Sequence, residues 1–324
     1  MAVIAGIDEA GYGPVLGPLV VTAVAFEVPD DRAGASLWEL LAAGVGRTAA
    51  RRGGRLAIGD SKKLYSRRTG RSVEHLERAT LAALGSLPER RRCATLGDLL
   101  AATAPAARGA LRGYPWYADA PLELPRCIGA TDRDLATNAL SATMRRAGVR
   151  LLTVRCEPVP VGEFNRLVTA TDNKTTMLLS ITGRLLHHVW DLIDGSSGAI
   201  RVDRQGGRMR YRPYLRDLFP RCRLKVLDEG DGRSAYRLVD DRRAAEVSFG
   251  VCADAEHLPT ALASMVSKYV RELFMEQFNA FWTRRVSGVA PTAGYYVDGR
   301  RFYGAIAPTI RELGIDERRV YRCR

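Results

Sequence analysis

Hydrophobic residues near the start of the chain follow the pattern of two β-strands joined by a glycine-rich turn. Residues 2–7 and 18–28 are rich in Val, Ile, Leu and Ala, which is typical of strands that are buried in a sheet. Glycines punctuate the segment between them, at positions 11, 13 and 17. Because glycine favours turns, we expect the two strands to be neighbours in one sheet.

The rest of the chain mixes period-2 patterns, which are typical of strands, with period-3.6 patterns, which are typical of helices. Strands are predicted at 149–159, 199–203, 223–227, 234–239 and 245–252. Helices are predicted at 35–50, 131–146, 171–190 and 259–282. No internal repeat or low-complexity linker divides the chain, so we expect a single domain over residues 1–324.

Residues 85–130 have a different composition. They contain an arginine run at 90–92, an alanine-rich stretch at 101–110 and the sequence Tyr-Pro-Trp-Tyr at 114–117. We interpret 85–130 as an insertion. Two interpretations of its role are open: a helical excursion over a substrate face, or a solvated decoration.

Charge and cysteine content narrow the class of protein. The formal net charge of +13 over 324 residues favours a polyanionic partner, because cationic side chains that neutralise phosphates release condensed counterions. An Arg- and Ala-rich composition is a second explanation of this charge, so the charge is only supporting evidence. The six cysteines form no Cys-x-x-Cys pair, which argues against a zinc site or a disulfide framework and favours a reducing compartment. With no signal peptide and no long apolar run, we expect a soluble, cytoplasmic protein without membrane contact.

Acidic residues occur at the ends of three predicted strands or just beyond them. Asp8 and Glu9 are adjacent, Asp203 ends the strand at 199–203, and Asp254 follows the strand at 245–252. Adjacent carboxylates repel one another unless a cation offsets their charge. Two hard cations bridged by carboxylates can activate water, neutralise phosphate oxygens and stabilise a leaving alkoxide. Mg²⁺ and Mn²⁺ are the natural ions for an all-oxygen site.

Each acid also has a simpler interpretation. Asp8 and Glu9 could be a solvated strand end, and Asp203 could cap a turn. Asp254 could cap the following helix. The predicted hairpin before it offers competing acids, at Asp228, Glu229 and Asp231.

Several motifs resemble ribonuclease HII, of the type 2 ribonuclease H family. The opening Asp-Glu-Ala-Gly-Tyr-Gly-Pro at 8–14 is similar to the family's Asp-Glu-Ala-Gly-Arg-Gly-Pro, with Tyr12 in place of the arginine. Asp-Ser-Lys-Lys-Leu at 60–64 matches a second family element. Val202-Asp203, Ala253-Asp254-Ala255 with the helix after it, and Ala293-Gly294-Tyr295 resemble later ones, without the glycine after Asp203, the Lys-Gly before Asp254 and the lysine before Gly294.

The resemblance implies an α/β fold: a ribonuclease H-like mixed sheet flanked by helices, with a C-terminal helical region at 259–324. It implies a metal-dependent endonuclease that hydrolyses the RNA strand of RNA/DNA hybrids, or incises at ribonucleotides in duplex DNA, and leaves 3′-hydroxyl ends. The implied catalytic and metal-binding residues, which hold two Mg²⁺ or Mn²⁺ ions, are Asp8, Glu9, Asp203 and Asp254. The implied substrate-binding residues are Gly11, Tyr12, Gly13, Ser61, Lys62, Lys63 and Tyr295. We expect a monomer.

Alternatives remain open. In the family, the Gly-Arg-Gly turn grips the nucleotides at the RNA–DNA junction, so Tyr12 bears on single-ribonucleotide recognition. The related ribonuclease HIII also lacks that arginine, but we expect no room before Ile4 for its extra N-terminal domain. Lys62 and Lys63 could be ordinary surface charges. The rival functions are another nuclease of the same fold, such as a junction resolvase or an integrase-type strand transferase, and a non-catalytic nucleic-acid-binding relative.

Overall fold

A seven-stranded mixed sheet forms the centre of the computed structural model, which describes residues 1–49, 54–65, 73–89, 92–118 and 121–323. The strand order is β5-β2-β1-β6-β9-β8-β7. The strands are β1 (Ala2–Ala10), β2 (Leu19–Val28), β5 (Arg150–Val159), β6 (Ser197–Asp203), β7 (Arg223–Glu229), β8 (Arg233–Val239) and β9 (Ala244–Gly250). β1, β6 and β9 are parallel to one another, and the outer strands pair antiparallel. The carboxyl ends of three adjacent strands therefore meet at one edge of the sheet.

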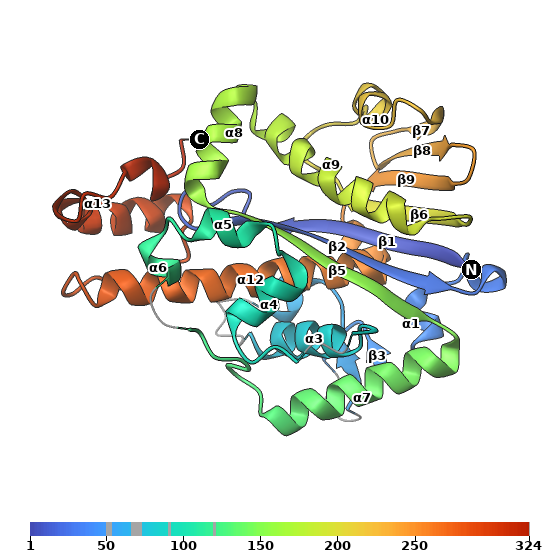
Figure 1. The fold of residues 1–324 in the computed structure, drawn as a ribbon, viewed down its shortest axis with the longest axis horizontal. Helices are drawn as coiled ribbons and strands as arrows, with labels where there is room; N and C mark the ends of the chain where they lie inside the picture. Colours follow the sequence, from blue (N-terminus) through green and yellow to red (C-terminus); the bar gives the residue numbers. More distant parts are fainter. Residues whose placement is uncertain (50–53, 66–72, 90–91, 119–120, 324) are drawn as a thin grey trace.

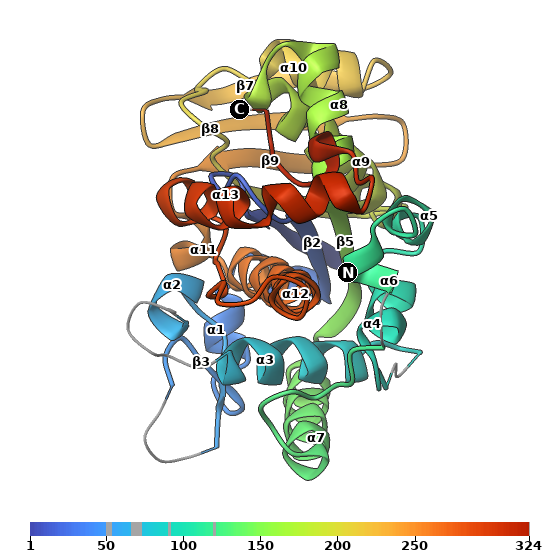
Figure 2. The ribbon, with the colours of Figure 1, turned by 90° about the vertical axis from the view of Figure 1, so that its left-hand side faces the viewer.

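Helices cover both faces of the sheet (Figure 1). One face carries α8 (Val161–Thr171), α9 (Lys174–Leu192) and α10 (Arg212–Leu218). The other carries α12 (Leu258–Thr283), and behind it α3 (Glu74–Gly85), α4 (Leu96–Thr103) and α7 (Ala130–Ala147). Figure 2 shows α12 end-on, with α13 (Tyr296–Glu312) crossing it. This confirms the predicted fold class, a mixed α/β sheet flanked by helices with a helical C-terminal region.

The alternation of side chains along β1 explains how the sheet fits between the two helical layers. Val3, Ala5 and Ile7 are buried against the α8–α10 side, while Gly6 faces α12. A Cβ atom at Gly6 would lie 2.1 Å from the backbone nitrogen of Thr260. Glycine at this position therefore lets the start of α12 lie directly on β1, next to the acidic end of the strand.

The segment 85–130 is a packed part of the molecule, so its interpretation as a solvated decoration is wrong for the described residues. It forms α4, α5 (Ala107–Leu111) and α6 (Pro115–Ala118). Trp116 is 2% exposed and packs edge-on against Phe278 and Phe281 of α12. Residues 90–91, most of the arginine run, and 119–120 lie outside the described residues.

A buried carboxylate fastens the end of this segment to two helices. Glu77 of α3 is fully buried and accepts four hydrogen bonds, from the backbone nitrogens of Arg126 (2.6 Å), Cys127 (2.6 Å) and Ile128 (2.9 Å) and from the Tyr269 hydroxyl (2.6 Å). Two of these donors bind each carboxylate oxygen. The loop at 126–128 is thereby held against both α3 and α12.

The helix predicted over 35–50 is wrong for most of its length. Only α1 (Leu37–Leu40) is helical, and Val45–Gly46 instead forms β3, which pairs in parallel with β4 (Leu56–Ala57). The physical reason is tertiary, because the chain turns after Leu40 and Val45–Gly46 pair with Leu56–Ala57, while α7 approaches Gly44 so closely that a Cβ atom there would lie 2.2 Å from Thr143 Oγ1. The spacing of the leucines resembles one face of a helix, but beyond Leu40 the chain buries apolar side chains from a turn instead.

The remaining predicted elements are present, with shifted ends. The predicted strands correspond to β1, β2 and β5–β9, and the predicted helices to α7, α9 and α12. The neighbouring antiparallel pairing of β1 and β2 is confirmed, as is the β7–β8 hairpin. Within the described residues, no helix is both long and apolar enough to span a bilayer.

Candidate active site

The four predicted acids lie at the carboxyl ends of the three parallel strands. Asp8 and Glu9 are near the end of β1, and Asp203 is the last residue of β6. Because Ile7 pairs with Val202 in the parallel register, Asp8 and Asp203 occupy equivalent positions on neighbouring strands. Asp254 belongs to α11 (Ala253–Glu256), just beyond β9. The sheet thus brings together acids that are as far apart in sequence as residues 8 and 254.

A strained turn after β9 connects Asp203 with the Asp254 segment. Cys252 has a φ of +56°, a left-handed conformation that non-glycine residues seldom adopt. The turn points the backbone nitrogen of Ala253 at Asp203 Oδ1, at 2.9 Å. Asp254 does not cap α12, whose N-cap residue is His257. Of the competing acids in the hairpin, Glu229 accepts a hydrogen bond from the Tyr236 hydroxyl at 2.5 Å.

The acids share one electrostatic environment. Burial raises the pKa of Asp8 well above its ordinary value, and the charges of Glu9, Asp203 and Asp254 raise it further, while a hydrogen bond from Ser264 lowers it. Burial and the charge of Asp203 raise the pKa of Glu9 to about 8. The pKa values of Asp203 and Asp254 are also raised, with burial as the largest cause and another carboxylate as a further cause in each case. These carboxylates are close enough to repel one another in a region from which water is partly excluded.

Lys62 lies beside this cluster. Burial is the largest single effect on its pKa and lowers it, but the charges of Asp254, Asp8, Asp203 and Asp60 together outweigh burial and raise the pKa above its ordinary value. Lys62 belongs to α2 (Ser61–Leu64), where the Asp60 side chain accepts a hydrogen bond from the Lys62 backbone nitrogen at 2.9 Å. The structure thus brings Lys62 to the acids.

The other two predicted residues of this element have different surroundings. The exposed Lys63 pairs with Asp60 at 3.7 Å. Ser61 is buried, and its hydroxyl lies 3.1 Å from that of Ser264 on α12. Ser61 therefore joins α2 to α12 and lies behind the surface that a large ligand can reach.

The glycine-rich turn after β1 rests on two buried arginines. Gly11 has a φ of +89°, and a Cβ atom there would lie 2.5 Å from Arg271 Nε. Arg322, which is 1% exposed, donates from Nη1 to the Gly11 carbonyl oxygen at 2.5 Å and from Nη2 to the Gly17 carbonyl oxygen at 2.6 Å. Burial and the charge of Arg271 lower the pKa of Arg322 to about 9. The sequence analysis missed Arg322, because no local pattern links residues 11 and 322.

Tyr12 and Gly13 lie at the accessible side of this turn. Tyr12 is half-buried, and its hydroxyl lies 3.3 Å from Thr175 Oγ1. The ammonium of Lys174 lies over the Tyr12 ring, 4.6 Å from the centroid. Gly13 is exposed and has open space where a side chain would be, so a ligand can approach its backbone. Lys174 was also missed, because the helix start at 173–176 carries no motif that points to a ligand.

Tyr295 lies beside the chain segment that follows the turn. It is 60% exposed and immediately precedes α13. The neighbouring Gly294 carbonyl oxygen accepts hydrogen bonds from the backbone nitrogens of Val15 (2.8 Å) and Leu16 (3.2 Å). The structure therefore places Tyr295 beside the segment that carries Gly11, Tyr12 and Gly13.

The acid cluster fits hard divalent cations by its chemistry. Its donors are all carboxylate oxygens, which suit Mg²⁺ and Mn²⁺, and Glu9 Oε2 is buried without a hydrogen-bond partner. Within the described residues, no three His, Cys, Asp or Glu side chains already form a group that could hold a metal ion. The cluster thus has the charge and the unpartnered oxygen for a cation, and its side chains would have to turn to bind one.

The raised pKa values predict how the metal-free protein responds to pH. Because folding raises the pKa of Glu9 from 4.5 to about 8, the folded state binds more protons than the unfolded state between those values. Its contribution to the free energy of unfolding is therefore present below pH 4.5 and is lost as the pH rises to about 8. Mg²⁺ or Mn²⁺ should raise the melting temperature more at pH 8 than at pH 6, since fewer protons then compete.

The measurement is thermal unfolding in EDTA and in Mg²⁺ across this pH range. Glu9→Gln is the control, because it removes the titrating group and retains the shape of the side chain. The difference in melting temperature between native protein and variant should depend on pH. Parallel curves would show that Glu9 does not titrate in this range.

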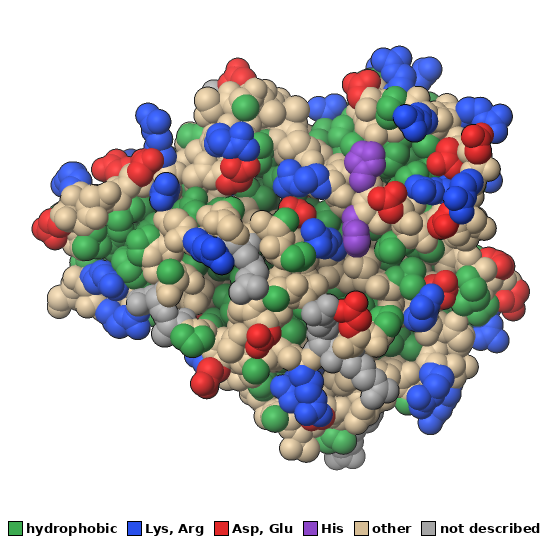
Figure 3. Space-filling model, in the orientation of Figure 1, with side chains coloured by type: hydrophobic (Ala, Val, Ile, Leu, Met, Phe, Trp, Pro, Cys, Tyr) green, Lys and Arg blue, Asp and Glu red, His purple; other side chains and the backbone are tan. Residues whose placement is uncertain are grey.

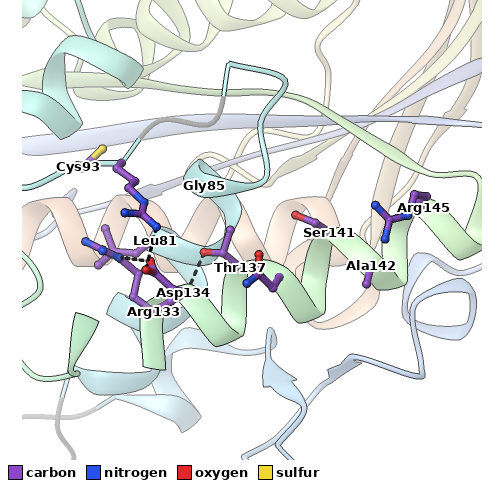
Figure 4. A pocket seen from close by; sticks show the side chains of 11 residues that line it. Leu81, Gly85, Cys93, Arg133, Asp134, Thr137, Ser141, Ala142 and Arg145 are labelled. Carbon is purple, nitrogen blue, oxygen red and sulfur yellow. Dashed lines mark hydrogen bonds and ion pairs between the residues drawn. The ribbon is translucent and has the colours of Figure 1, made fainter. Parts of the chain in front are cut away.

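A separate hollow lies between α3 and α7. It has a volume of about 430 Å³, and Figure 4 shows its lining. Arg92 and Arg133 both reach Asp134, at 3.0 Å each, and these arginines lower the pKa of Asp134. The charged groups that line this hollow thus partly neutralise one another. The hollow contains none of the predicted site residues.

The positive charge is not gathered into a single stripe on the face seen in Figure 3. Lys and Arg side chains are spread over that face, with Asp and Glu among them. The net charge of +13 thus describes the whole chain, and a phosphate-binding surface has to be argued from individual residues.

Comparisons with known proteins give structural neighbours only. No protein-family model and no curated protein matches the chain. The chain is similar to Bst-RNase HIII, crystallised in complex with Mn²⁺, with 18% identity, a TM-score of 0.48 and coverage of 99% of this chain and 66% of that one. It is similar to RNase HII of Archaeoglobus fulgidus, from a complex with PCNA, with 14% identity, a TM-score of 0.42 and coverage of 99% and 94%. It is also similar to ribonuclease H2 of Pyrococcus horikoshii OT3, with 13% identity, a TM-score of 0.41 and coverage of 98% and 92%.

The chain thus spans slightly less than two thirds of the length of the ribonuclease HIII chain of the first comparison, 66%. At these identities and TM-scores, the alignments assign no activity to this chain.

Proposed function

We propose that this protein is a divalent-metal-dependent endonuclease of the ribonuclease H type, which hydrolyses the RNA strand of RNA/DNA hybrids or incises at ribonucleotides in duplex DNA and leaves 3′-hydroxyl ends. One observation carries the proposal. Four acids from three distant segments lie at the carboxyl ends of β1, β6 and β9, and the charges of the cluster raise the pKa values of Asp8, Glu9 and Asp203. Such perturbed clusters are typical of catalytic sites.

Asp8, Glu9, Asp203 and Asp254 would hold the cations. A bound pair of Mg²⁺ or Mn²⁺ ions would supply a nucleophilic water at neutral pH and would neutralise charge on the phosphate and the leaving oxygen. The protein's own contribution is positional. The Ala253 nitrogen fixes the orientation of Asp203, and Lys62 offers a cation to a phosphate at the edge of the cluster.

The turn at 11–17 and Tyr295 would contact the substrate. The open backbone at Gly13 and the exposed Tyr295 belong to two segments that are hydrogen-bonded to each other, through the Gly294 carbonyl oxygen and the backbone nitrogens of Val15 and Leu16. A ring can stack on a sugar or base, and backbone groups can reach 2′-hydroxyls, which distinguish RNA from DNA. In this scheme Gly11 keeps the turn in shape, and Ser61 supports α2 from behind.

The preferred substrate depends on Tyr12. An arginine offers several fixed donors to a phosphate, whereas Tyr12 offers one hydroxyl and a ring. A substrate with a single ribonucleotide should suffer most from this difference, because a continuous hybrid supplies further 2′-hydroxyls to the turn and to Tyr295. We therefore expect weaker cleavage at isolated ribonucleotides than at stretches of four or more, with Tyr12→Arg shifting the ratio toward single sites.

The test is incubation with Mg²⁺ or Mn²⁺ and end-labelled duplexes that carry no, one, four or all ribonucleotides in one strand. Cleavage confined to ribonucleotide-containing strands, with 3′-hydroxyl products, is the expected result. Cleavage of branched DNA instead would favour another nuclease of this fold. Binding without cleavage of any duplex would favour the non-catalytic relative. Equal cleavage of single and continuous sites by the native protein would show that Tyr12 is an adequate substitute for arginine.

A further inference from the structure

Two helical residues position the side chain of Tyr12. The Lys174 ammonium lies 4.6 Å from the centroid of its ring, and its hydroxyl lies 3.3 Å from Thr175 Oγ1. Lys174 and Thr175 are the first two residues of α9. The start of a long helix and the glycine-rich turn thus meet at this ring.

Among the described residues, no carboxylate is paired with the positive charge of Lys174. Its half-buried side chain contacts the rings of Tyr12 and Phe164. Burial and the charge of Arg322 lower the pKa of its ammonium. Both effects disfavour the cation, so an anion that bound here would relieve them.

The two other cations at this turn are already engaged with the backbone. Arg322 donates to the carbonyl oxygens of Gly11 and Gly17, and Arg271 donates to those of Leu16 and Ala293. Both are almost fully buried. Their charges contribute to the positive potential, but Lys174 is the member of this group with an ammonium that ligands can reach.

The ring that Lys174 covers belongs to a residue that follows the acids Asp8 and Glu9 closely in sequence. Tyr12 is three positions after Glu9, so their Cα atoms are at most about 11 Å apart. Phosphates on one strand of a duplex are spaced by about 3.4 Å along the helix axis. A cation held over the Tyr12 ring can therefore meet a phosphate a few nucleotides from the one at the acids.

We propose that Lys174, held over the ring of Tyr12, binds a backbone phosphate of the nucleic-acid substrate a few nucleotides from the acid cluster. This inference rests on the proposed function and names a residue for it. A lysine ammonium acts as a point charge without the fixed fork of an arginine. Lys174 thus contributes affinity for the nucleic-acid backbone. It does not orient a phosphate as an arginine at position 12 would, which is consistent with weaker incision at single ribonucleotides.

The first test measures binding of a labelled hybrid in EDTA at several salt concentrations, so that cleavage does not enter. Lys174→Met keeps an unbranched apolar stem on the Tyr12 ring and removes the charge. The slope of log K against log salt should become shallower by about 0.9 in this variant, and Lys174→Arg should restore it. Lys225→Met is the matched control, because Lys225 is an exposed lysine on the outer strand β7.

The second test locates the phosphate. Hybrids that carry one neutral methylphosphonate at each of the three linkages on either side of the cleavage position are compared. The methylphosphonate at one linkage should weaken binding by the native protein. The same methylphosphonate should cause no further loss in Lys174→Met, because the variant already lacks that contact. Equal melting temperatures would exclude a folding defect.

An unchanged salt slope in Lys174→Met, or additive losses at every linkage, would overturn the assignment of Lys174. Hybrid cleavage by the native protein would still support the proposed function in that case. If the native protein bound no duplex at any salt concentration, both proposals would fail.

Discussion

Asp203→Asn should abolish metal-dependent cleavage and leave hybrid binding in EDTA nearly unchanged. The amide retains an oxygen for the hydrogen bond from the Ala253 nitrogen, so the turn after β9 should keep its shape. It removes one of the charges that the cations need. Replacing an outer-shell partner of a metal ligand already costs 10- to 100-fold, so loss of a ligand charge should lower the rate by more than ~10²-fold.

The loss of the Asp203 charge should not lower the stability of the metal-free protein, whereas a folding defect would lower it. Asp203 raises the pKa values of Asp8 and Glu9 by repulsion. Asp203→Asn should therefore leave the melting temperature in EDTA at pH 8 equal or higher, and should reduce the increase that Mg²⁺ causes. The measurements are single-turnover cleavage and thermal unfolding. Asp217→Asn, at an exposed acid on α10, should change neither. Cleavage at the native rate by Asp203→Asn would refute the assignment.

Glu77→Gln should destabilise the protein strongly without touching the acid cluster. The carboxylate accepts two hydrogen bonds at each oxygen, from three backbone nitrogens and the Tyr269 hydroxyl. A glutamine has the same shape but only one acceptor oxygen, so its amide group would face two donors. Leaving a buried donor unsatisfied costs about 1–3 kcal/mol, so the free energy of unfolding should fall by roughly 3 kcal/mol.

Urea unfolding measures this change as a shift of the midpoint at an unchanged slope. Glu74→Gln is the control, because Glu74 is exposed on the same helix and a surface change of this kind is worth within about 0.5 kcal/mol. A similar small effect in Glu77→Gln would mean that the loop at 126–128 is held mainly by its apolar contacts.

The sheet and the acid cluster were predictable because their signals are local. Short apolar runs that end in acids marked β1 and β6, and the polar turn between two alternating runs marked the β7–β8 hairpin. Whether all four acids act as ligands remains a prediction. The glycine-rich turn was also predictable from the sequence, since the positive φ at Gly11 favours a residue without a side chain.

Other features depend on contacts between distant segments. The leucines at 37–41 have helical spacing, yet the helix ends at Leu40 and the chain continues into β3, which pairs with β4. The composition of 85–130 did not reveal that Trp116 would be buried against α12. The environment of Tyr12 depends on Lys174 and Arg322, which tertiary structure alone brings to it. These residues carry no motif, so one sequence without its fold gives no reason to select them.

The hydrogen bonds of Arg322 to the turn also limit the order in which parts of the protein can fold during synthesis. Gly11 and Arg322 are 311 positions apart, so during synthesis the turn leaves the ribosome long before the guanidinium that supports it exists. Domains fold as units while N-terminal parts emerge first, and contacts of such high sequence separation form late. A nascent chain can therefore build much of its sheet while the turn beside the acids still lacks this support. If the proposed function holds, cleavage competence should be acquired only after residue 322 has been synthesised.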